Sequence, residues 1–500
     1  MIRLRTTLVT ACGACAMALS MAQAPLCVDP SFQVLFPYYE ITDIDFLPNG
    51  QLLLGGRMTN PLGFSPSTLS VCRVSYGGSF DPTFTQIGPS GGGIQIWDEE
   101  YFFNAGGALG VFRKFISNGA SDLSYGSVNP EFSTGQRWSF HIFPDGKQWR
   151  TGWYSKRLFD DEGNQIGSEP GYGLLQVLPD GNTDPDFDHK YTAPGWLTSI
   201  SETPDGRFLL GSPGGPTQYE GRSVGGILRV WPDGQLDTTF HSSIFWGAVS
   251  PNYYFYPDGR ILAFGNFQAP EYPGDTLAVV RLHPDGSTDT SWPVIPFRAM
   301  GFFPGLAMAR DFLEIEPGKL IVVGEFNAIG DQPAGAITAI DTAGNVLWDL
   351  FTGTDAGELV ISSANSVQRA LYGIEQAPDG FIYIFGSYSG FDDGCSNHPN
   401  QRLITRLYPL HVGVDELASA DVMSVTPNPS NGRFALNYQG QPEAGQLEVR
   451  DPLGRIVLHD RLSPLSTEHQ VVLENVGAGL YICRVNWGGR IAIAQIVVGL

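Results

Sequence analysis

The feature that most constrains this chain is a pair of short phrases that it repeats along most of its length. The first phrase is a turn of the Pro-Asp-Gly type followed by an apolar strand that ends in glycine, as in TPDGRFLLG at 203–211. The second often carries an arginine before its turn and closes with an aspartate and an aromatic residue, as in VWPDGQLDTTF at 230–240. Any fold for this chain must therefore be built from one unit used many times.

The two phrases alternate, and the first can be recognised in seven copies. These copies span residues 46–56, 96–107, 143–152, 203–211, 256–265, 316–324 and 377–386. Complete copies of the second phrase end at Phe84, Tyr125, Phe187, Phe240, Trp292 and Phe351. A seventh copy begins at 404–409 but lacks its aspartate and aromatic residue.

Each phrase predicts a β-hairpin. Asp-Gly or Asn-Gly between two apolar runs, as at Asp233-Gly234, supplies the positive φ that a tight turn needs. Two phrases then give four antiparallel strands every roughly 50–60 residues. A lone four-stranded sheet cannot bury both faces, whereas radial stacking of such sheets does. We therefore predict an all-β fold whose main part is a seven-bladed β-propeller.

The missing piece of the seventh copy stands at the other end of the chain. The sequence DPSF, at 29–32, precedes the first copy and has the lost aspartate and aromatic residue. We expect this N-terminal strand to be the outermost strand of the seventh blade, near Leu407, so that the ring has no open edge. A disulfide between Cys27 and Cys395 could pin the closure.

With PDGxxLLxG alternating with RLxPDGxxDxxF, the chain resembles the delta-sixty repeat of secreted bacterial propellers over about residues 29–410. The resemblance implies the fold and is almost silent on function, because the motif residues make turns and cores. Two copies depart from the pattern, at Asp98-Glu99-Glu100 and at NVLWDLF.

The N-terminus predicts export. Arg3 and Arg5 precede an apolar run, and SMAQ offers small residues for cleavage before Gln23, so residues 1–22 read as a signal peptide. A lipoprotein site at Cys12 is disfavoured because its apolar run would be very short. A net charge of −22 argues against nucleic acid or anionic lipid as a partner. No later run reaches the roughly 18 apolar residues of a membrane span.

The last part of the chain has a different composition. We predict a propeller over 23–412, a linker over 413–424 and a small immunoglobulin-like β-sandwich over 425–500, from alternating segments such as LEVRDPLGRIV. Landmarks in order are Pro427-Asn428-Pro429, the Gly432 turn, the 451–454 hairpin, GLY at 479–481 and a final apolar strand.

With these landmarks the tail resembles the type A C-terminal sorting domain of the type IX secretion system. The resemblance implies that the secretion machinery is a partner. It also implies that the protein is released from a Gram-negative bacterium or attached to its outer surface. Gln495 departs from the family, where a basic residue is frequent. Cys483 reads as a small buried hydrophobic residue.

Motifs that carry chemistry are scarce. The mature chain has no GxSxG, Walker, HExxH or paired CxxC motif, and its histidines lack metal-ligand spacing, so we name no catalytic or cofactor-binding residue. DGNTDPDFD places oxygens at alternate positions, as calcium loops do. The candidate ligands are Asp180, Asn182, Asp184, Asp186 and Asp188. Much of this run is the ordinary repeat, which we favour over a calcium site.

A recurring arginine before the second turn offers a second candidate feature. The positions are Arg73, Arg113, Arg229, Arg281 and Arg406. A ring of arginines could bind anions, but one structural ion pair in each blade explains the repetition better.

Function is expected in the parts that do not repeat. Long polar loops on the side away from the Asp-Gly turns carry Tyr154, Tyr172, Tyr219 and Tyr388, which look exposed. We predict a monomeric, non-enzymatic module that binds an extracellular protein or glycan on this side. The alternatives are a glycan- or peptide-cleaving enzyme and a structural surface component. Carboxylates converging at the propeller mouth would favour the enzyme, and an apolar plug would favour binding or structure.

Overall fold

The computed structural model describes most of the chain from Leu26 onward, and every described element is a β-strand. The described residues are 26–34, 39–63, 68–85, 93–97, 101–105, 113–125, 132–187, 189–193, 197–212, 217–245, 251–299, 307–348, 355–357, 359–361, 366–394, 396–409, 423–438, 441, 443–451, 455–473, 476–477, 479–487 and 490–499. They fall into two compact units, Met1–Pro409 and Leu410–Leu500. The predicted signal peptide lies outside the described residues. Within these ranges no helix is long and apolar enough to cross a membrane.

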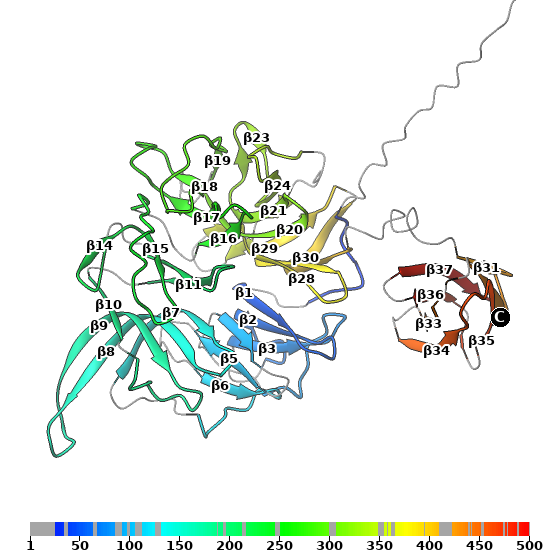
Figure 1. The fold of residues 1–500 in the computed structure, drawn as a ribbon, viewed down its shortest axis with the longest axis horizontal. Helices are drawn as coiled ribbons and strands as arrows, with labels where there is room; N and C mark the ends of the chain where they lie inside the picture. The colour runs from blue at the N-terminus through cyan, green and yellow to red at the C-terminus, as the bar shows by residue number, and fades with distance from the viewer. Residues whose placement is uncertain are drawn as a thin grey trace, which may run out of the picture. The chain divides into compact units, whose positions relative to one another are not determined.

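Among the described residues of the first unit, seven antiparallel sheets have the same order of first, second and third strand, and they follow one another around a ring (Figure 1). The count of seven blades stays a prediction. The first three are β1 (Tyr39–Phe46), β2 (Leu52–Thr59) and β3 (Thr68–Val74); β4 (Gly93–Ile96), β5 (Tyr101–Ala105) and β6 (Arg113–Ile116); and β7 (Phe132–Ile142), β8 (Gln148–Phe159) and β9 (Gln165–Val177). The next two are β11 (Ser199–Glu202), β12 (Phe208–Gly211) and β15 (Ile227–Val230); and β16 (Asn252–Phe255), β17 (Ile261–Phe267) and β18 (Leu277–Leu282). The last two are β20 (Met308–Glu316), β21 (Lys319–Glu325) and β24 (Ile337–Asp341); and β28 (Ala370–Gln376), β29 (Ile382–Asp392) and β30 (Asn397–Leu407).

A single bridge adds a fourth strand segment to each of these sheets. Six bridges lie just after the third strands, and they are Val74–Phe80, Phe115–Ser121, Val177–Thr183, Val230–Leu236, Leu282–Thr288 and Ile340–Val346. The seventh joins Val28 to Leu407. There the Asp29 N–H donates to the Arg406 carbonyl at 2.9 Å. The predicted all-β propeller fold, closed by its own N-terminal strand, is therefore confirmed.

The repeated arginine and aspartate form an ion pair within one sheet. Arg229 Nε lies 2.7 Å from Asp237 Oδ2, and the other oxygen of Asp237 accepts the Thr239 N–H at 2.9 Å. The equivalent pairs are Arg73–Asp81, Lys114–Asp122, Arg281–Asp289 and Arg406–Asp29, at 2.9, 3.4, 2.8 and 2.6 Å. The pairs within one repeat tie the third strand to the turn that follows it, and Arg406–Asp29 ties β30 to the closing N-terminal segment, so the motif is structural.

The closing aromatic residue of the second phrase joins neighbouring sheets. Ring atoms of Phe240 lie 2.9 Å from the place that a Cβ on Gly286 would occupy, and Phe187 stands at the same distance from Gly234. Both glycines also have positive φ, +86° and +78°. A larger residue would be strained and would clash, so the repeat requires glycine here for two reasons.

Shorter strands extend this framework. β10 (Lys190–Ala193), β13 (Thr217–Tyr219) and β14 (Arg222–Val224) add to the sheet of β7–β9, and β25 (Asp355–Ala356) pairs with β29. β19 (Phe297–Arg298), β22 (Ala328–Ile329) and β23 (Gln332–Pro333) form a small sheet, as do β26 (Leu359–Ile361) and β27 (Ser366–Gln368).

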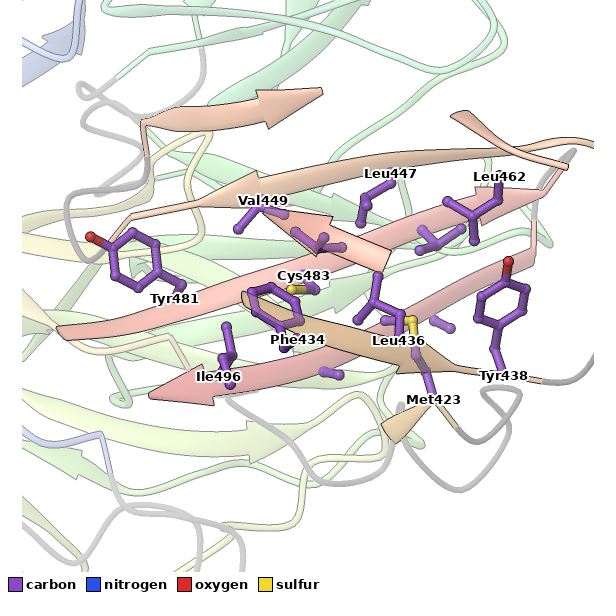
Figure 2. Close-up of a cluster of buried hydrophobic side chains, with 14 of the residues drawn as sticks. Met423, Phe434, Leu436, Tyr438, Leu447, Val449, Leu462, Tyr481, Cys483 and Ile496 are labelled. Carbon is purple, nitrogen blue, oxygen red and sulfur yellow. The ribbon is translucent and has the colours of Figure 1, made fainter. Parts of the chain in front are cut away.

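The second unit contains two sheets with one core. One sheet is β31 (Ser424–Thr426), β32 (Arg433–Asn437) and β35 (Glu468–Val472), and the other is β34 (Ile456–Leu462), β33 (Gly445–Arg450), β36 (Gly479–Trp487) and β37 (Arg490–Val498). Side chains from both, including Phe434 and Ile496, meet in the core (Figure 2). Cys483 is fully buried there as a free thiol, as predicted, and burial raises its pKa to about 12. The immunoglobulin-like topology stays a prediction.

Candidate functional site

The candidate site is a central cavity of about 560 Å³ in the first unit. We call the first strand of each of the seven sheets its inner strand. The cavity lining comes from six of these inner strands, β1, β7, β11, β16, β20 and β28, and the seventh inner strand is β4. The polar groups that line it include Thr42, Ser139, Ser201, Asn252, Arg310 and Tyr372. Each inner strand runs from the cavity toward its Pro-Asp-Gly-type turn. The cavity therefore lies on the side of the long connections between second and third strands.

Those connections are strands in the structure. β8 and β9 stay paired as far as Phe159 and Gln165, and the predicted loop before β15 forms the β13–β14 hairpin. The prediction of exposed tyrosines is wrong at two positions. Tyr219 and Tyr388 are fully buried, because their rings pack into the sheets while their hydroxyls donate to the Gly234 carbonyl and to Thr405 Oγ1. The structure describes the backbone of Tyr154 and Tyr172 but not their side chains, so the prediction is not tested there.

Aspartates of the inner strands hold neighbouring sheets together next to the cavity. Three backbone N–H groups donate to them, Ile94 to Asp43 (2.7 Å), Ile96 to Asp45 (2.6 Å) and Ile374 to Asp311 (3.0 Å). Each bond crosses from one inner strand to the next. The free edge of an inner strand would otherwise expose unpaired N–H donors, so these carboxylates join neighbouring sheets by hydrogen bonds.

These carboxylates lie close enough for the charge of one to shift the pKa of another. Burial, followed by the charges of Asp45 and Asp311, raises the pKa of Asp43 to about 7, although backbone hydrogen bonds oppose the shift. Burial raises the pKa of Asp311 to about 7 as well. Glu375, on β28, has no hydrogen-bond partner among the described residues. Burial and the charges of Asp43, Asp311 and Asp45 raise its pKa to about 9, so it holds a proton at neutral pH.

Arg310 and Glu40 on the cavity wall have side-chain partners. Arg310 Nε donates to Glu325 Oε1 at 2.8 Å, and the guanidinium lies 5.5 Å from the centre of the Tyr372 ring. The Tyr372 hydroxyl donates to Glu40 Oε2 at 3.1 Å. These contacts join the sixth, seventh and first sheets around the charged half of the cavity. The other half, from β7, β11 and β16, offers hydroxyl and amide groups.

The predicted calcium loop follows the ordinary repeat. Asp180 accepts hydrogen bonds from the backbone and side chain of Asn182, both at 2.9 Å. Asp184 is buried and accepts from Lys147 Nζ and Gln176 Nε2, both at 2.8 Å. Asp188 lies outside the described residues. Groups of three or more acidic, histidine or cysteine side chains suited to a metal are absent from the described parts of the chain.

The predicted arginine ring is a set of ion pairs, with one correction. In the second sheet the paired residue is Lys114, not Arg113, because the Asp122 N–H donates to the Lys114 carbonyl as Asp81 does to Arg73. The third sheet has Gln176 at this position, and Lys147 from β8's preceding turn supplies the positive charge for Asp184 at 2.8 Å.

Of the two cysteines that were predicted to pair, only Cys27 lies within the described residues. Cys27 is disulfide-bonded, and Cys395 lies outside the described residues, so their pairing stays a prediction. The neighbouring residues support it, since the Val28 N–H donates to Asp393 Oδ2 at 2.6 Å.

Ser396, His398 and Asp393 resemble a catalytic triad but have a different geometry. Ser396 Oγ and Asp393 Oδ2 lie 2.8 and 3.2 Å from the same ring nitrogen, His398 Nε2. In a triad the serine and the aspartate bond opposite nitrogens of the imidazole. Asp393 also accepts from Val28, so this group anchors the closing strand.

Sequence reasoning missed the carboxylates in and beside the central cavity. Asp43, Asp311 and Glu375 belong to three different copies of the repeat and stand more than 50 residues apart. The one available signal was the presence of charged residues in strands that should be apolar, such as TDIDF at 42–46.

The fold and the cavity define a β-propeller protein with a separate two-sheet C-terminal unit. Residues 424–499 match the Secretion system C-terminal sorting domain family (Por_Secre_tail), and 203–240 and 257–291 match a beta-propeller domain of unknown function (DUF5122). The protein thus carries β-propeller repeats and a type IX sorting domain, which directs it to the extracellular space or the cell surface. The delta-sixty resemblance stays a prediction.

Two solved structures resemble this chain distantly. PorZ, an essential bacterial surface component of the type IX secretion system of Porphyromonas gingivalis, is 11% identical with a TM-score of 0.32. The match covers 93% of this chain and 66% of PorZ, just under two thirds of its length. YCF48 bound to D1 peptide is 14% identical with a TM-score of 0.36, covering 76% of this chain and 95% of that one. Among curated proteins none matches. Likenesses this distant say nothing of function.

Proposed function

We propose that this exported propeller is a non-enzymatic recognition module that holds part of an extracellular protein or glycan in the central cavity. The observation that carries the proposal is the polar cavity of about 560 Å³, a size typical of ligand sites. Hydroxyl, amide, phenol and guanidinium groups converge there from six sheets. The apolar plug that would favour a purely structural role is not found among its described lining residues.

The carboxylates next to the cavity support binding better than catalysis. Asp43 and Asp311 each accept backbone hydrogen bonds that hold neighbouring sheets together. A catalytic acid or base must exchange its proton with a substrate. These two groups would have to give up a structural bond to do so.

The test is a variant that fills the cavity. The full-length exported protein and Ser201→Trp, whose side chain would occupy the cavity, are compared on arrays of extracellular glycans and peptides. Glu162→Trp, at the tip of the β8–β9 hairpin, is the matched control. Binding should disappear only in Ser201→Trp. Equal binding by all three proteins would contradict the proposal.

Glu375 favours a second function, hydrolysis of a glycan or peptide. Its raised pKa and its lack of a hydrogen-bond partner among the described residues are typical of a general acid. A digestion screen with polysaccharides and peptides tests this reading. Product formed by the natural chain and lost in Glu375→Gln would establish the enzyme, and the absence of product with both would leave the binding function.

A further inference from the structure

The inner strands reach the cavity through irregularities in their pairing. In β1 the register shifts between Ile41 and Asp43, which leaves Thr42 as an extra residue, and in β20 and β28 the extra residues are Arg310 and Tyr372. In β7 the shift between Arg137 and Phe140 leaves two residues opposite Thr151, and the second of them is Ser139. The three extra residues and Ser139 line the cavity. A β-bulge interrupts the ladder and re-aims a side chain, and here three bulges deliver their extra residue to one place, while a fourth brings Ser139 there.

The glycine that ends the first phrase makes these bulges possible. A Cβ on Gly56 would lie 2.5 Å from the Glu40 carbonyl oxygen. The backbones of Met308 and Ala370 would obstruct Gly324 and Gly386 in the same way. The repeat therefore keeps a glycine beside each bulge, while the bulged residue itself differs from copy to copy.

The cavity presents hydroxyl groups and an aromatic ring with little free charge. The positive charge of Arg310 is met by Glu325, and Glu40 accepts the Tyr372 hydroxyl. Asp43 and Asp311 share a raised pKa near 7, which limits the negative charge behind the cavity. Hydroxyls, amides and a tyrosine face match the hydroxyls and apolar faces of sugar rings.

Resting on the function proposed above, we infer that the cavity binds the end of a neutral oligosaccharide and that Thr42, Ser139, Arg310 and Tyr372 select it. Carboxylated or sulfated sugars would meet the carboxylates of Glu40 and Asp43, so they bind more weakly. The repeated hairpins supply a constant framework, and the residues at the bulges supply the specificity.

The full-length exported protein is tested first on an array of neutral, carboxylated, sulfated and amino oligosaccharides. The neutral sugar with the strongest signal is then titrated calorimetrically. Tyr372→Ala should weaken binding at least tenfold, and Thr42→Val and Ser139→Ala about threefold each. Trp348→Ala, which removes an exposed aromatic residue outside the cavity, should bind as the natural chain does. Tyr372→Phe, which removes only the hydroxyl, replaces the alanine variant if that variant fails to fold.

Each of the other possible results contradicts either the inferred ligand or the proposed function. The inference is overturned if only charged sugars bind or if no sugar binds. It is also overturned if the Tyr372 and Thr42 variants bind the sugar with unchanged affinity. Binding of a peptide that Ser201→Trp abolishes, without any sugar signal, overturns the inference and keeps the proposed function. Sugar binding accompanied by release of shorter products keeps the ligand class and overturns the non-enzymatic function.

Discussion

The pKa of an aspartate is lowered at one place in the propeller and raised at another. Burial by itself would raise the pKa of Asp237, but the hydrogen bonds from Thr239 and the pairing with Arg229 lower it to about 2. On the inner strands, Asp43 has backbone donors but no cation among the described residues, and burial together with neighbouring carboxylates raises its pKa to about 7. The surroundings, and not the residue type, decide which aspartates are charged.

The first prediction concerns Asp237, which is 1% exposed and bonds both Arg229 and Arg207. Asp237→Asn should cost about 3–5 kcal/mol of unfolding free energy, because it leaves buried arginine without its counter-charge. Urea unfolding measures the loss. Asp258→Asn, in an exposed pair with Arg260, is the control and should show no measurable change. Equal effects of the two variants would contradict the structural role of the repeated pair.

The second prediction concerns the pH dependence that Glu375 confers. Its folded-state pKa, about 9, lies above the value of 4.5 for the unfolded chain. The stability that the protonated group confers is therefore complete below about pH 4.5 and is lost as the pH rises through 9. Glu375→Gln cannot titrate, so its advantage over the natural chain should grow across this window.

Thermal unfolding at several pH values measures the effect. At pH 9 the glutamine variant should melt at least about 2–4 °C above the natural chain, corresponding to 1 kcal/mol or more. At pH 4.5 the two should melt alike, apart from any constant offset. A difference that does not change with pH would show that Glu375 is not held in its protonated form.

At the scale of elements, the first phrase was predictable as a hairpin, and its bulge was not. The turn residues and apolar runs indicate two strands around each Pro-Asp-Gly-type turn, as β16 and β17 show. The bulge of β20 depends on how Gly324 meets Met308 across the sheet. The sequence pattern contains the glycine, but only the pairing register shows which residue of the opposite strand is left unpaired in the bulge.

The third prediction concerns the closing strand. A mature chain that starts at Gln33 lacks the segment that pairs with β30, where the Tyr408 N–H donates to the Cys27 carbonyl at 2.9 Å. It should melt at a lower temperature, and hydrogen exchange at Tyr408 and along the free edge of β30 should accelerate. Unchanged exchange at Tyr408 would mean that β30 is protected without the N-terminal strand.

At the scale of the whole molecule, two units carry separate tasks. The propeller has the cavity, and the unit that contains residues 424–499 matches the sorting domain of an export system.

The fourth prediction concerns export. In a host with a type IX secretion system, a chain that ends at Pro409 should accumulate in the periplasm, because it lacks the sorting domain. Immunoblots of culture medium, cell surface and periplasm measure where it is. The full-length chain in the same host is the control, and delivery of the truncated chain to the medium or the surface would contradict the assignment.

The sequence by itself determined the repeated hairpins, the propeller, the closing strand and the sorting domain, because each depends on local turn chemistry or on a pattern that recurs at a fixed period. It also favoured the ion pair within each repeat, since Arg229 and Asp237 stand eight residues apart. Only the tertiary structure decided which side chains line the cavity and which carboxylates lie beside it. Asp43, Asp311 and Glu375 come close enough to interact because the closed ring brings the first sheet next to the seventh. It also buried Tyr219 and Tyr388, since packing between strands, and not polarity along the chain, sets exposure.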